Sequence, residues 1–403
     1  MKRSTHYLIG LLVVSAILVP DVSFAATAKL EVSGWLPYWR KATSTADIAP
    51  HLSVFKEINP FGYSVKSDGT LADTAKLTEE PWTSLIAAAK AKKVRIIPTV
   101  MWSDGATIDR ILSDGVSRRQ LEDDITALVK DNGYDGIEID FEGKKAETKD
   151  YFSTFLKGLY QRMGTKWVMC DIEPRTPISA RYDGTPPADA GQYANDYVQI
   201  NKYCDRVKIM AYDQGTIDVK LNKLANGAPY IPVADPAWVE KVIQEVRKTI
   251  PVRKLMLGIP TYGYEYEVTP LSEQGYRYDL LWAFNQKYAY DLLLQYHPSV
   301  QRNSAGELSF AYLPNVLPDV PPPNTEAPYD VPAGAATTSG YGKLSTLGGV
   351  AILSTNPVFN LVWWSDANAI KDKIALAKKY GLRGVSFFKI DGGEDPALWD
   401  VLK

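Results

Sequence analysis

Short apolar runs alternate with longer amphipathic stretches along most of the chain. The runs are rich in Val, Ile and Tyr, as is typical of β-strands, whereas the stretches between them place apolar residues at helical spacing. Eight strands are predicted, over residues 32–39, 55–65, 94–102, 135–142, 167–172, 206–212, 255–262 and 384–390. The predicted helices cover residues 81–92, 117–132, 149–163, 192–203, 237–249 and 367–380, with a closing helix within 396–402. This alternation predicts an α/β fold of the (β/α)8 TIM barrel type over residues 30–402.

An open, doubly wound sheet is the alternative architecture. It is disfavoured because no glycine-rich phosphate-binding loop follows the first predicted strand. The segment between strands seven and eight is far too long for a single crossover, so residues 265–365 are expected to form a small α+β insertion. Strand-like stretches at 308–312 and 361–364 predict a β-hairpin there, and seven prolines between Pro314 and Pro332 predict a loop. We expect the insertion to form one wall of a cleft.

The fourth predicted strand carries an unusual row of acids. Residues 135–142 alternate strictly, so that two isoleucines and a phenylalanine fall on one side and Glu138, Asp140 and Glu142 fall on the other. A surface strand with its acids in water is one interpretation. The other is functional, because both faces of a strand are covered in a parallel barrel and three inward carboxylates would repel one another.

The position of Glu142 suits catalysis. Active sites of such barrels lie at the carboxyl ends of the strands, and Glu142 ends the predicted strand. Alternate side chains are about 6.6 Å apart along a strand, a gap that long carboxylates can close to share a proton. Like charges so close raise at least one pKa, which favours Glu142 as an acid at neutral pH, although the titration belongs to the cluster.

Composition narrows the classes of function. The chain has 403 residues, 45% hydrophobic and 23% charged, and a formal net charge of −2, so no basic surface argues for nucleic-acid binding. The 24 Tyr and 10 Trp residues suit either sugar stacking or an aromatic core. Only three histidines are present, which leaves little material for a Ser-His-Asp triad or a histidine metal site, and no cofactor or metal is expected. Cys170 and Cys204 are either two buried thiols or one bridge.

The amino-terminal residues have the pattern of an export signal. Lys2 and Arg3 precede an apolar run over 8–19, Pro20 breaks the run, and small residues up to Ala25 offer a cleavage site. The run is shorter than the ~20 residues of a transmembrane helix, and an uncleaved anchor is the lesser alternative. Residues 1–25 are therefore predicted to be a signal peptide of a secreted, periplasmic or cell-envelope protein.

Several motifs together resemble one enzyme family. Residues 135–142 resemble the D-x-x-D-x-D-x-E signature of glycoside hydrolase family 18, the chitinase-like barrels. Four other stretches agree in order and place: 59–65 with the following Asp68-Gly69 turn, 210–213 (Met-Ala-Tyr-Asp), 258–263 and 380–385. The likeness covers residues 32–402, and the last hundred residues look closest to bacterial spore-cortex and cell-wall N-acetylglucosaminidases.

The resemblance implies a substrate-assisted mechanism, in which the 2-acetamido oxygen of the sugar attacks the anomeric carbon and the enzyme supplies no nucleophile. By position, Glu142 would protonate the glycosidic oxygen and later activate water. Asp140 would orient the acetamido N–H and stabilise the oxazolinium ion. Tyr212 would hydrogen-bond the acetamido oxygen, with Asp213 beside it.

The sequence departs from the family pattern at two positions. The second aspartate of the signature is Glu138, one methylene longer, so its resting hydrogen bond to Asp140 must be rearranged. The tryptophan on strand eight, which forms the floor under the reacting sugar, aligns with Phe388, which stacks but has no N–H donor. Asp171 and Glu173 are additional acids that we expect in an exposed loop, with a charged cleft wall or a bound cation as alternatives.

Aromatic residues near strand ends are candidates for sugar subsites, although core packing is equally common for each of them. They are Trp35, Tyr63, Trp102 and Tyr262, which join Glu138, Asp213 and Phe388 as predicted substrate-binding residues.

The sequence therefore predicts an exported, retaining glycosidase that acts on β-linked N-acetylglucosamine polysaccharide, either peptidoglycan or chitin, as a monomer without nucleic-acid or stable membrane partners. The first alternative is a saccharide-binding, lectin-like protein on the same barrel, which the departures at Glu138 and Phe388 keep open. A second is a barrel glycosidase with two opposed carboxylates, which would need a further essential acid such as Asp171 or Glu173.

Overall fold

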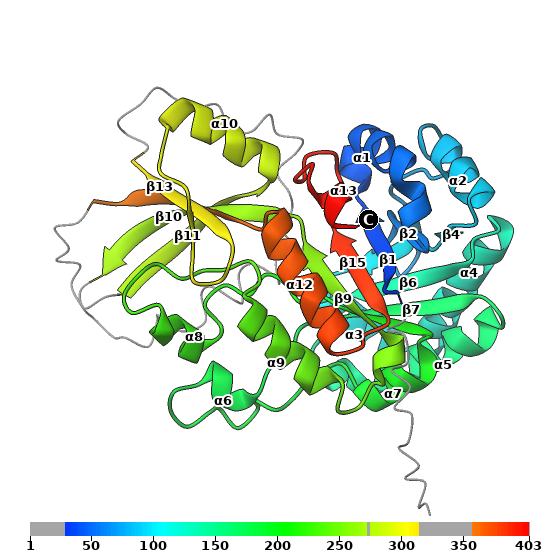
Figure 1. Cartoon of the computed structure of the whole chain (residues 1–403). Helices are drawn as coiled ribbons and strands as arrows, with labels where there is room; N and C mark the ends of the chain where they lie inside the picture. Colours follow the sequence, from blue (N-terminus) through cyan, green and yellow to red (C-terminus); the bar gives the residue numbers. More distant parts are fainter. Residues whose placement is uncertain (1–28, 272–274, 314–356, 403) are drawn as a thin grey trace, which may run out of the picture.

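The computed structural model describes residues 29–271, 275–313 and 357–402, and eight parallel strands of this part form a barrel (Figure 1). The predicted signal peptide and the proline-rich loop 314–332 lie outside the described residues. The barrel strands are β1 (Glu31–Leu36), β2 (Glu57–Val65), β5 (Thr99–Trp102), β6 (Gly136–Phe141), β7 (Trp167–Ile172), β8 (Arg206–Ile209), β9 (Leu255–Pro260) and β15 (Gly384–Phe388). Two short strands, β3 (Leu71–Asp73) and β4 (Arg95–Ile96), pair with β2.

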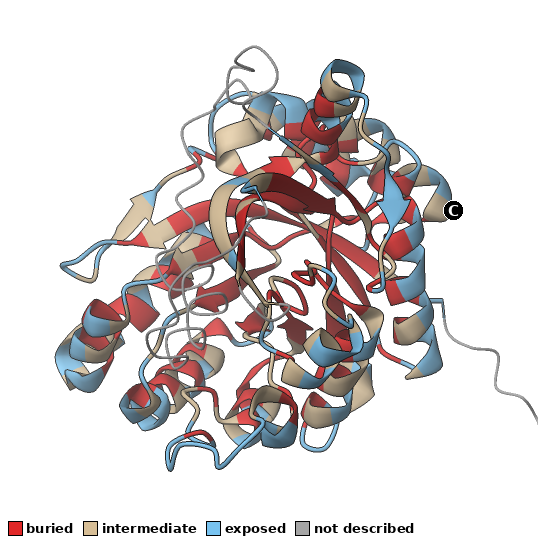
Figure 2. Ribbon diagram, turned by 90° about the vertical axis from the view of Figure 1, so that its left-hand side faces the viewer, coloured by how far each residue is buried: buried red, intermediate tan, exposed pale blue. Residues whose placement is uncertain are grey.

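Strand β1 closes the barrel, because it pairs in parallel with β15 on one side and with β2 on the other. The predicted (β/α)8 architecture is confirmed, and the open sheet is wrong because no gap separates the first and last strands. Figure 2 shows the strands buried at the centre, with exposed residues on the outer faces of the helices. The helices outside the insertion are α1 (Lys41–Ile48), α2 (Trp82–Ala91), α3 (Gly105–Ser113), α4 (Gly115–Asp131), α5 (Lys149–Met163), α6 (Ile178–Arg181), α7 (Tyr197–Tyr203), α8 (Val219–Leu224), α9 (Pro236–Val246), α12 (Ala367–Lys379) and α13 (Leu398–Val401).

Local chemistry explains where elements begin and end differently from the prediction. The predicted strand 94–102 is divided into β4 and β5 around Pro98, which has no N–H for the ladder. Helix α7 begins only at Tyr197, because the Asp196 side chain caps it by accepting from two backbone N–H groups. Helix α3 was not predicted, although Asp104 caps it in the same way.

A second sheet stands beside the barrel, where the chain leaves β9 (Figure 1). Its strands are antiparallel and follow the order β11 (Gly275–Asn285), β10 (Tyr262–Leu271), β14 (Phe359–Trp364), β13 (Leu308–Tyr312) and β12 (Gln301–Arg302), with α10 (Gln286–Tyr296) packed against them. The two stretches expected as a hairpin are β13 and β14, which pair directly. The long strands β10 and β11 were not predicted.

Glu307 joins this insertion to the barrel. Its buried carboxylate accepts hydrogen bonds from the backbone N–H groups of Val233 (2.9 Å) and Ala234 (3.1 Å) and from the Trp363 indole (2.7 Å). Lys373 of α12 lies 3.3 Å away and supplies the balancing charge. Buried, charge-assisted polar contacts therefore hold the insertion against α12 and against the segment that precedes α9.

Cys170 of β7 and Cys204, at the end of α7, form a disulfide. Of the two states left open by the sequence, the bridge is therefore the one observed. Within the described ranges, no helix has the length and apolar character needed to cross a membrane.

Candidate active site

Strand β6 presents its two faces to different parts of the fold. Phe141 packs outward, with its ring stacked 5.3 Å from that of Phe155 in α5. Glu138 and Asp140 face the barrel interior and are 0% and 3% exposed. Glu142 lies one residue beyond the strand and is half-buried, and its N–H donates to the Trp102 carbonyl at 2.8 Å. The predicted alternation is confirmed, and the interpretation of a surface strand with its acids in water is wrong.

Glu138 makes all its polar contacts with other barrel strands. One carboxylate oxygen, Oε2, accepts from the Trp35 indole at 2.8 Å and from the Thr99 hydroxyl at 2.7 Å. The other, Oε1, lies 2.6 Å from Nζ of Lys208, and both side chains are fully buried. The expectation that this glutamate contacts a sugar is not supported, because its extra methylene carries the carboxylate to protein partners.

The carboxyl groups of Asp140 and Glu142 lie close enough to interact with each other at the end of β6. A contact between two carboxyl groups is a hydrogen bond only if one of them holds a proton. Burial raises the pKa of Asp140 well above its usual value, and the charges of Glu142 and Glu138 raise it further. Burial, together with the charge of Glu173, raises the pKa of Glu142 to about 7. The pair can therefore hold a proton at neutral pH and release it to a neighbouring oxygen.

Two charged side chains flank Glu142: Lys144, which the sequence did not single out, and Glu173, for which a charged cleft wall was one of the alternatives. Lys144 follows it closely in the chain, has a fully buried side chain, and lies 3.4 Å from Glu173. Glu173 follows β7 and also accepts a hydrogen bond from Asn195. The negative charge of Glu173 raises the pKa of Glu142, whereas the positive charge of Lys144 lowers it. A lysine two residues after a catalytic motif gives no sequence signal of its own, because lysines are common in loops.

Tyr212 and Asp213 lie just past the end of β8. Tyr212 is buried near four carboxyl groups, and burial followed by the charge of Asp140 raises the pKa of its hydroxyl. Asp213 accepts hydrogen bonds from the hydroxyls of Tyr262 and Tyr264, the latter at 2.6 Å. A side chain at Gly258 would come within 2.9 Å of the Tyr212 ring, so this glycine makes room for the tyrosine.

Phe388 is the centre of an aromatic cluster at the carboxyl ends of the strands. Its ring stacks on Tyr212 at 5.5 Å and meets Trp35, Phe61 and Tyr262 edge-on at 5.8 Å each. Phe61 of β2 was not among the predicted site residues. The cluster brings three of the predicted aromatic residues together beside the acids, in a place where a sugar ring could stack.

Tyr63 and Trp102 point away from this cluster, contrary to prediction. Trp102 is level with Phe141 in the sheet and contacts its ring edge-on at 5.3 Å, so it packs under the helices. An irregularity between Phe61 and Tyr63 moves Tyr63 to the same outer face. Its hydroxyl bonds Tyr134, which precedes β6 at the opposite end of the strand from Glu142, at 2.9 Å. Both residues are core aromatics rather than part of the site.

The expectation that Asp171 lies in an exposed loop is wrong. It belongs to β7 and is 2% exposed. Its carboxyl group is close to those of Glu138 and Asp140, and burial raises its pKa well above the usual value. Glu173 is partly exposed at the edge of the site. Among the described residues, no group of three or more His, Cys, Asp or Glu side chains has an arrangement that could hold a metal ion.

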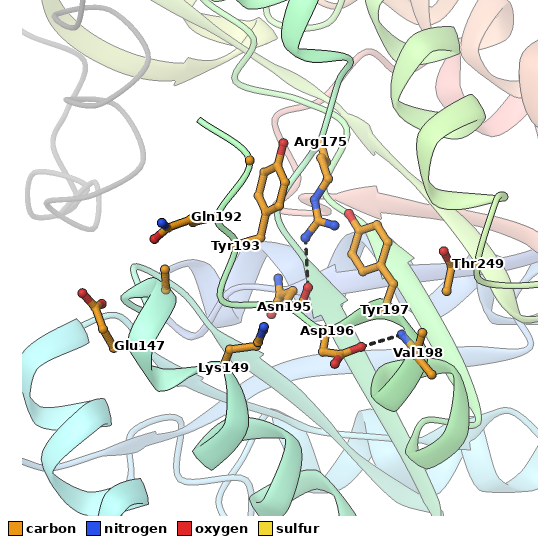
Figure 3. A pocket seen from close by; sticks show the side chains of 12 residues that line it. Glu147, Lys149, Arg175, Gln192, Tyr193, Asn195, Asp196, Tyr197, Val198 and Thr249 are labelled. Carbon is orange, nitrogen blue, oxygen red and sulfur yellow. Dashed lines mark hydrogen bonds between the residues drawn. The ribbon is translucent and has the colours of Figure 1, made fainter. Parts of the chain in front are cut away.

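A polar hollow of about 530 Å³ lies between the segments that follow β6 and β7 (Figure 3), and its lining residue Asn195 also bonds Glu173. Arg175 is sandwiched there between the rings of Tyr193 (3.6 Å) and Tyr197 (3.9 Å), and it donates to the Asn195 carbonyl. Two acids and two bases line the hollow, so it has no marked preference for charge. The lining residues include Glu147, Lys149, Arg175, Asn195 and Asp196.

Comparison with known proteins agrees with this geometry. The sequence model of glycosyl hydrolases family 18 matches residues 36–393. One relative is an uncharacterized glycosylase, YvbX, of Bacillus subtilis, which is 23% identical over 300 residues, or 74% of this chain and 70% of the relative.

Two crystal structures share the fold. The Bacillus cereus spore cortex-lytic enzyme SleL aligns with a TM-score of 0.65 and 19% identity, covering 93% of this chain and 73% of the enzyme. A chitinase from Chromobacterium violaceum aligns with a TM-score of 0.66 and 17% identity, covering 93% of this chain and 98% of the chitinase. At such identities, the alignments establish the barrel and not the substrate.

Proposed function

The chain belongs to glycosyl hydrolases family 18 and is a glycoside hydrolase, and from this premise we propose that it is an exported, retaining enzyme cleaving β-linked N-acetylglucosamine polymers. The observation that carries the proposal is the pair of adjacent carboxyl groups of Asp140 and Glu142, at the carboxyl end of β6 and with the pKa of Glu142 raised to about 7. Peptidoglycan and chitin both contain this sugar. By their names, SleL lyses the spore cortex and the Chromobacterium protein is a chitinase.

The proposed reaction begins when Glu142 gives its proton to the glycosidic oxygen and the bond to the anomeric carbon breaks. The 2-acetamido oxygen of the same sugar attacks that carbon and forms an oxazolinium ion. Asp140, which is ionised while Glu142 holds the proton of the pair, faces the acetamido N–H and stabilises the positive charge. The Tyr212 hydroxyl donates a hydrogen bond to the acetamido oxygen. Glu142 then takes a proton from water, which opens the ring with overall retention.

Phe388 and Tyr262 are the proposed platform for the reacting sugar. They meet edge-on at 5.8 Å, with Tyr262 held by its hydrogen bond to Asp213. Trp35 contacts the Phe388 ring edge-on. Its indole N–H already donates to Glu138 and is therefore not available to a sugar. Asp213 fixes two tyrosine hydroxyls and so orients this side of the site.

We also propose that residues 1–25 direct export and that the mature chain begins near Ala26 and acts as a monomer outside the cytoplasm. The support is the basic, apolar and small-residue pattern of these residues. Expression with the leader, followed by amino-terminal sequencing and light scattering of the purified protein, tests all three statements. A mature protein that retains Met1 would contradict cleavage.

The test of function is to incubate the purified protein with peptidoglycan, N-acetylglucosamine hexamers and cello-oligosaccharides of equal length. Product masses identify the polymer and the bond cleaved, and proton NMR of fresh products identifies the anomer. The proposal predicts β-anomeric products from the acetamido sugars and none from the cello-oligosaccharides. Binding of the hexamer without any turnover would favour the lectin-like alternative, and cleavage of cello-oligosaccharides would contradict the substrate-assisted mechanism.

A further inference from the structure

Asp171, Glu138 and Lys208 form a buried triad next to Asp140 in the barrel interior. Lys208 lies in β8 and Asp171 in β7, and the two are direct partners in the strand register. The β6–β7 register pairs Ile139 with Cys170, so the next step along both strands brings Asp140 level with Asp171. Neighbouring strands are about 4.8 Å apart, which places the two carboxyl groups side by side.

The triad contains two carboxyl groups but only one ammonium group, that of Lys208, to balance a negative charge. Lys208 lies 2.6 Å from Oε1 of Glu138, and Trp35 and Thr99 donate to the other oxygen of that carboxylate. Asp171 has no N–H or O–H donor for either of its buried oxygens among the described residues. The carboxyl group of Glu138 lies close to it, and two carboxyl groups form a hydrogen bond only through a proton.

We propose that Asp171 and Lys208 are positioning residues for Asp140. Lys208 holds Glu138 away from Asp140 as an ion pair, and Asp171 takes the vacated place beside Asp140 as an uncharged, protonated acid. This inference rests on the proposed function and deepens it, because it explains how the chain works with Glu138 in place of the expected aspartate.

The physical consequence concerns the charge on Asp140. In the proposed reaction this carboxyl group must be negative when the sugar becomes positive. The charged or titratable groups that face it are Glu138 and Glu142 from its own strand, Lys144, and Asp171, Lys208 and Tyr212 from the neighbouring strands. With Glu138 neutralised by Lys208 and Asp171 uncharged, a single negative charge is added to the interior during the reaction. An ionised Asp171 would oppose that step.

The experiment compares kcat and KM against pH for the wild-type enzyme, Asp171→Asn and Asp171→Ala, with an N-acetylglucosamine oligomer. Asn is neutral and keeps an N–H donor toward Glu138, so its pH profile should superimpose on that of the wild type with most of kcat retained. Ala removes the donor and should lower kcat by about tenfold or more with little change in KM. Glu57→Gln is the matched control, because Glu57 is also a buried acid near Lys208 but lies on β2.

A profile of Asp171→Asn displaced to lower pH would show that Asp171 carries a charge, and would overturn the proposal. Equal activity of Asp171→Ala and wild type would do so as well. Loss of turnover in both folded variants would assign Asp171 a direct proton-transfer role instead. Should Asp171→Ala fail to fold, the profile of Asp171→Asn decides alone. An inactive wild-type enzyme would instead refute the proposed function.

Discussion

The ammonium of Lys208 lies 2.6 Å from a carboxylate oxygen of Glu138 in the interior of the barrel, and water reaches neither side chain. The lysine also lies 4.4 Å from the centre of the Trp35 ring, whose N–H binds the same glutamate. A buried charge is tolerated only when paired, so the glutamate and the lysine depend on each other.

Removal of one partner is therefore expected to destabilise the fold strongly. Lys208→Met leaves the Glu138 carboxylate unpaired in the core and should lower the free energy of unfolding by about 3 to 5 kcal/mol. The double variant Glu138→Gln/Lys208→Met has no buried charge at this place and should lose less than the single variant. Urea denaturation measures both. A double variant less stable than the single one would contradict this account.

The charge of Glu173 should set the alkaline limit of activity. Glu142 must be protonated to act as an acid, so activity should fall as the pH rises through its pKa of about 7. A negative charge nearby disfavours ionisation, so removing it in Glu173→Gln should lower the pKa of Glu142. The descending limb of kcat/KM should then move to lower pH by about half a unit or more.

Two matched variants control this measurement. Lys144→Gln removes a positive charge near Glu142 and should move the same limb to higher pH. Glu147→Gln removes an exposed acid from the neighbouring hollow and should leave the limb in place. If Glu173→Gln moved the limb upward, the electrostatic explanation would be wrong.

The two groups of strand-end aromatics should behave differently on mutation. Phe388→Leu removes the ring on which Tyr212 stacks, and should lower kcat/KM by about tenfold with a modest loss of stability. Trp102→Leu removes a ring from the helix layer and should cost about 2 kcal/mol of stability while leaving KM unchanged. Steady-state kinetics and thermal unfolding of both variants test this contrast. A rise in KM for Trp102→Leu without a loss of stability would show that Trp102 contacts the substrate.

The acids of β6 could be predicted because their signal is local. Alternation over a single strand separates Asp140 from Ile139, and the parallel barrel then decides which face is inward. The same alternation explains why Trp102 faces outward. Thr99 and Met101 are level with the inward residues Glu138 and Asp140, so the next residue, Trp102, lies on the outer face. That inference needed the register between two strands, which the sequence does not contain.

Tyr63 and Lys208 show two other limits of prediction from the sequence. Tyr63 changes faces because the register shifts between Phe61 and Tyr63, around Gly62. A glycine within a strand is a sign of a bulge, but it does not show which way the following side chain turns. Lys208 stands out as a charge within an apolar strand, but its partner is 70 residues away in the chain. Asp171 lies in a strand with the predicted bounds 167–172, and its inward position follows from the β6–β7 register, which the sequence does not show.

The most direct test of the whole account is turnover by Glu142→Gln, measured beside the wild type with an N-acetylglucosamine oligomer and with calorimetric binding of the same sugar. The substitution removes the transferable proton and keeps the shape of the side chain. The account predicts that hydrolysis falls by a factor of about 1,000 or more while folding and sugar affinity remain close to those of the wild type. Undiminished hydrolysis by this variant would contradict it.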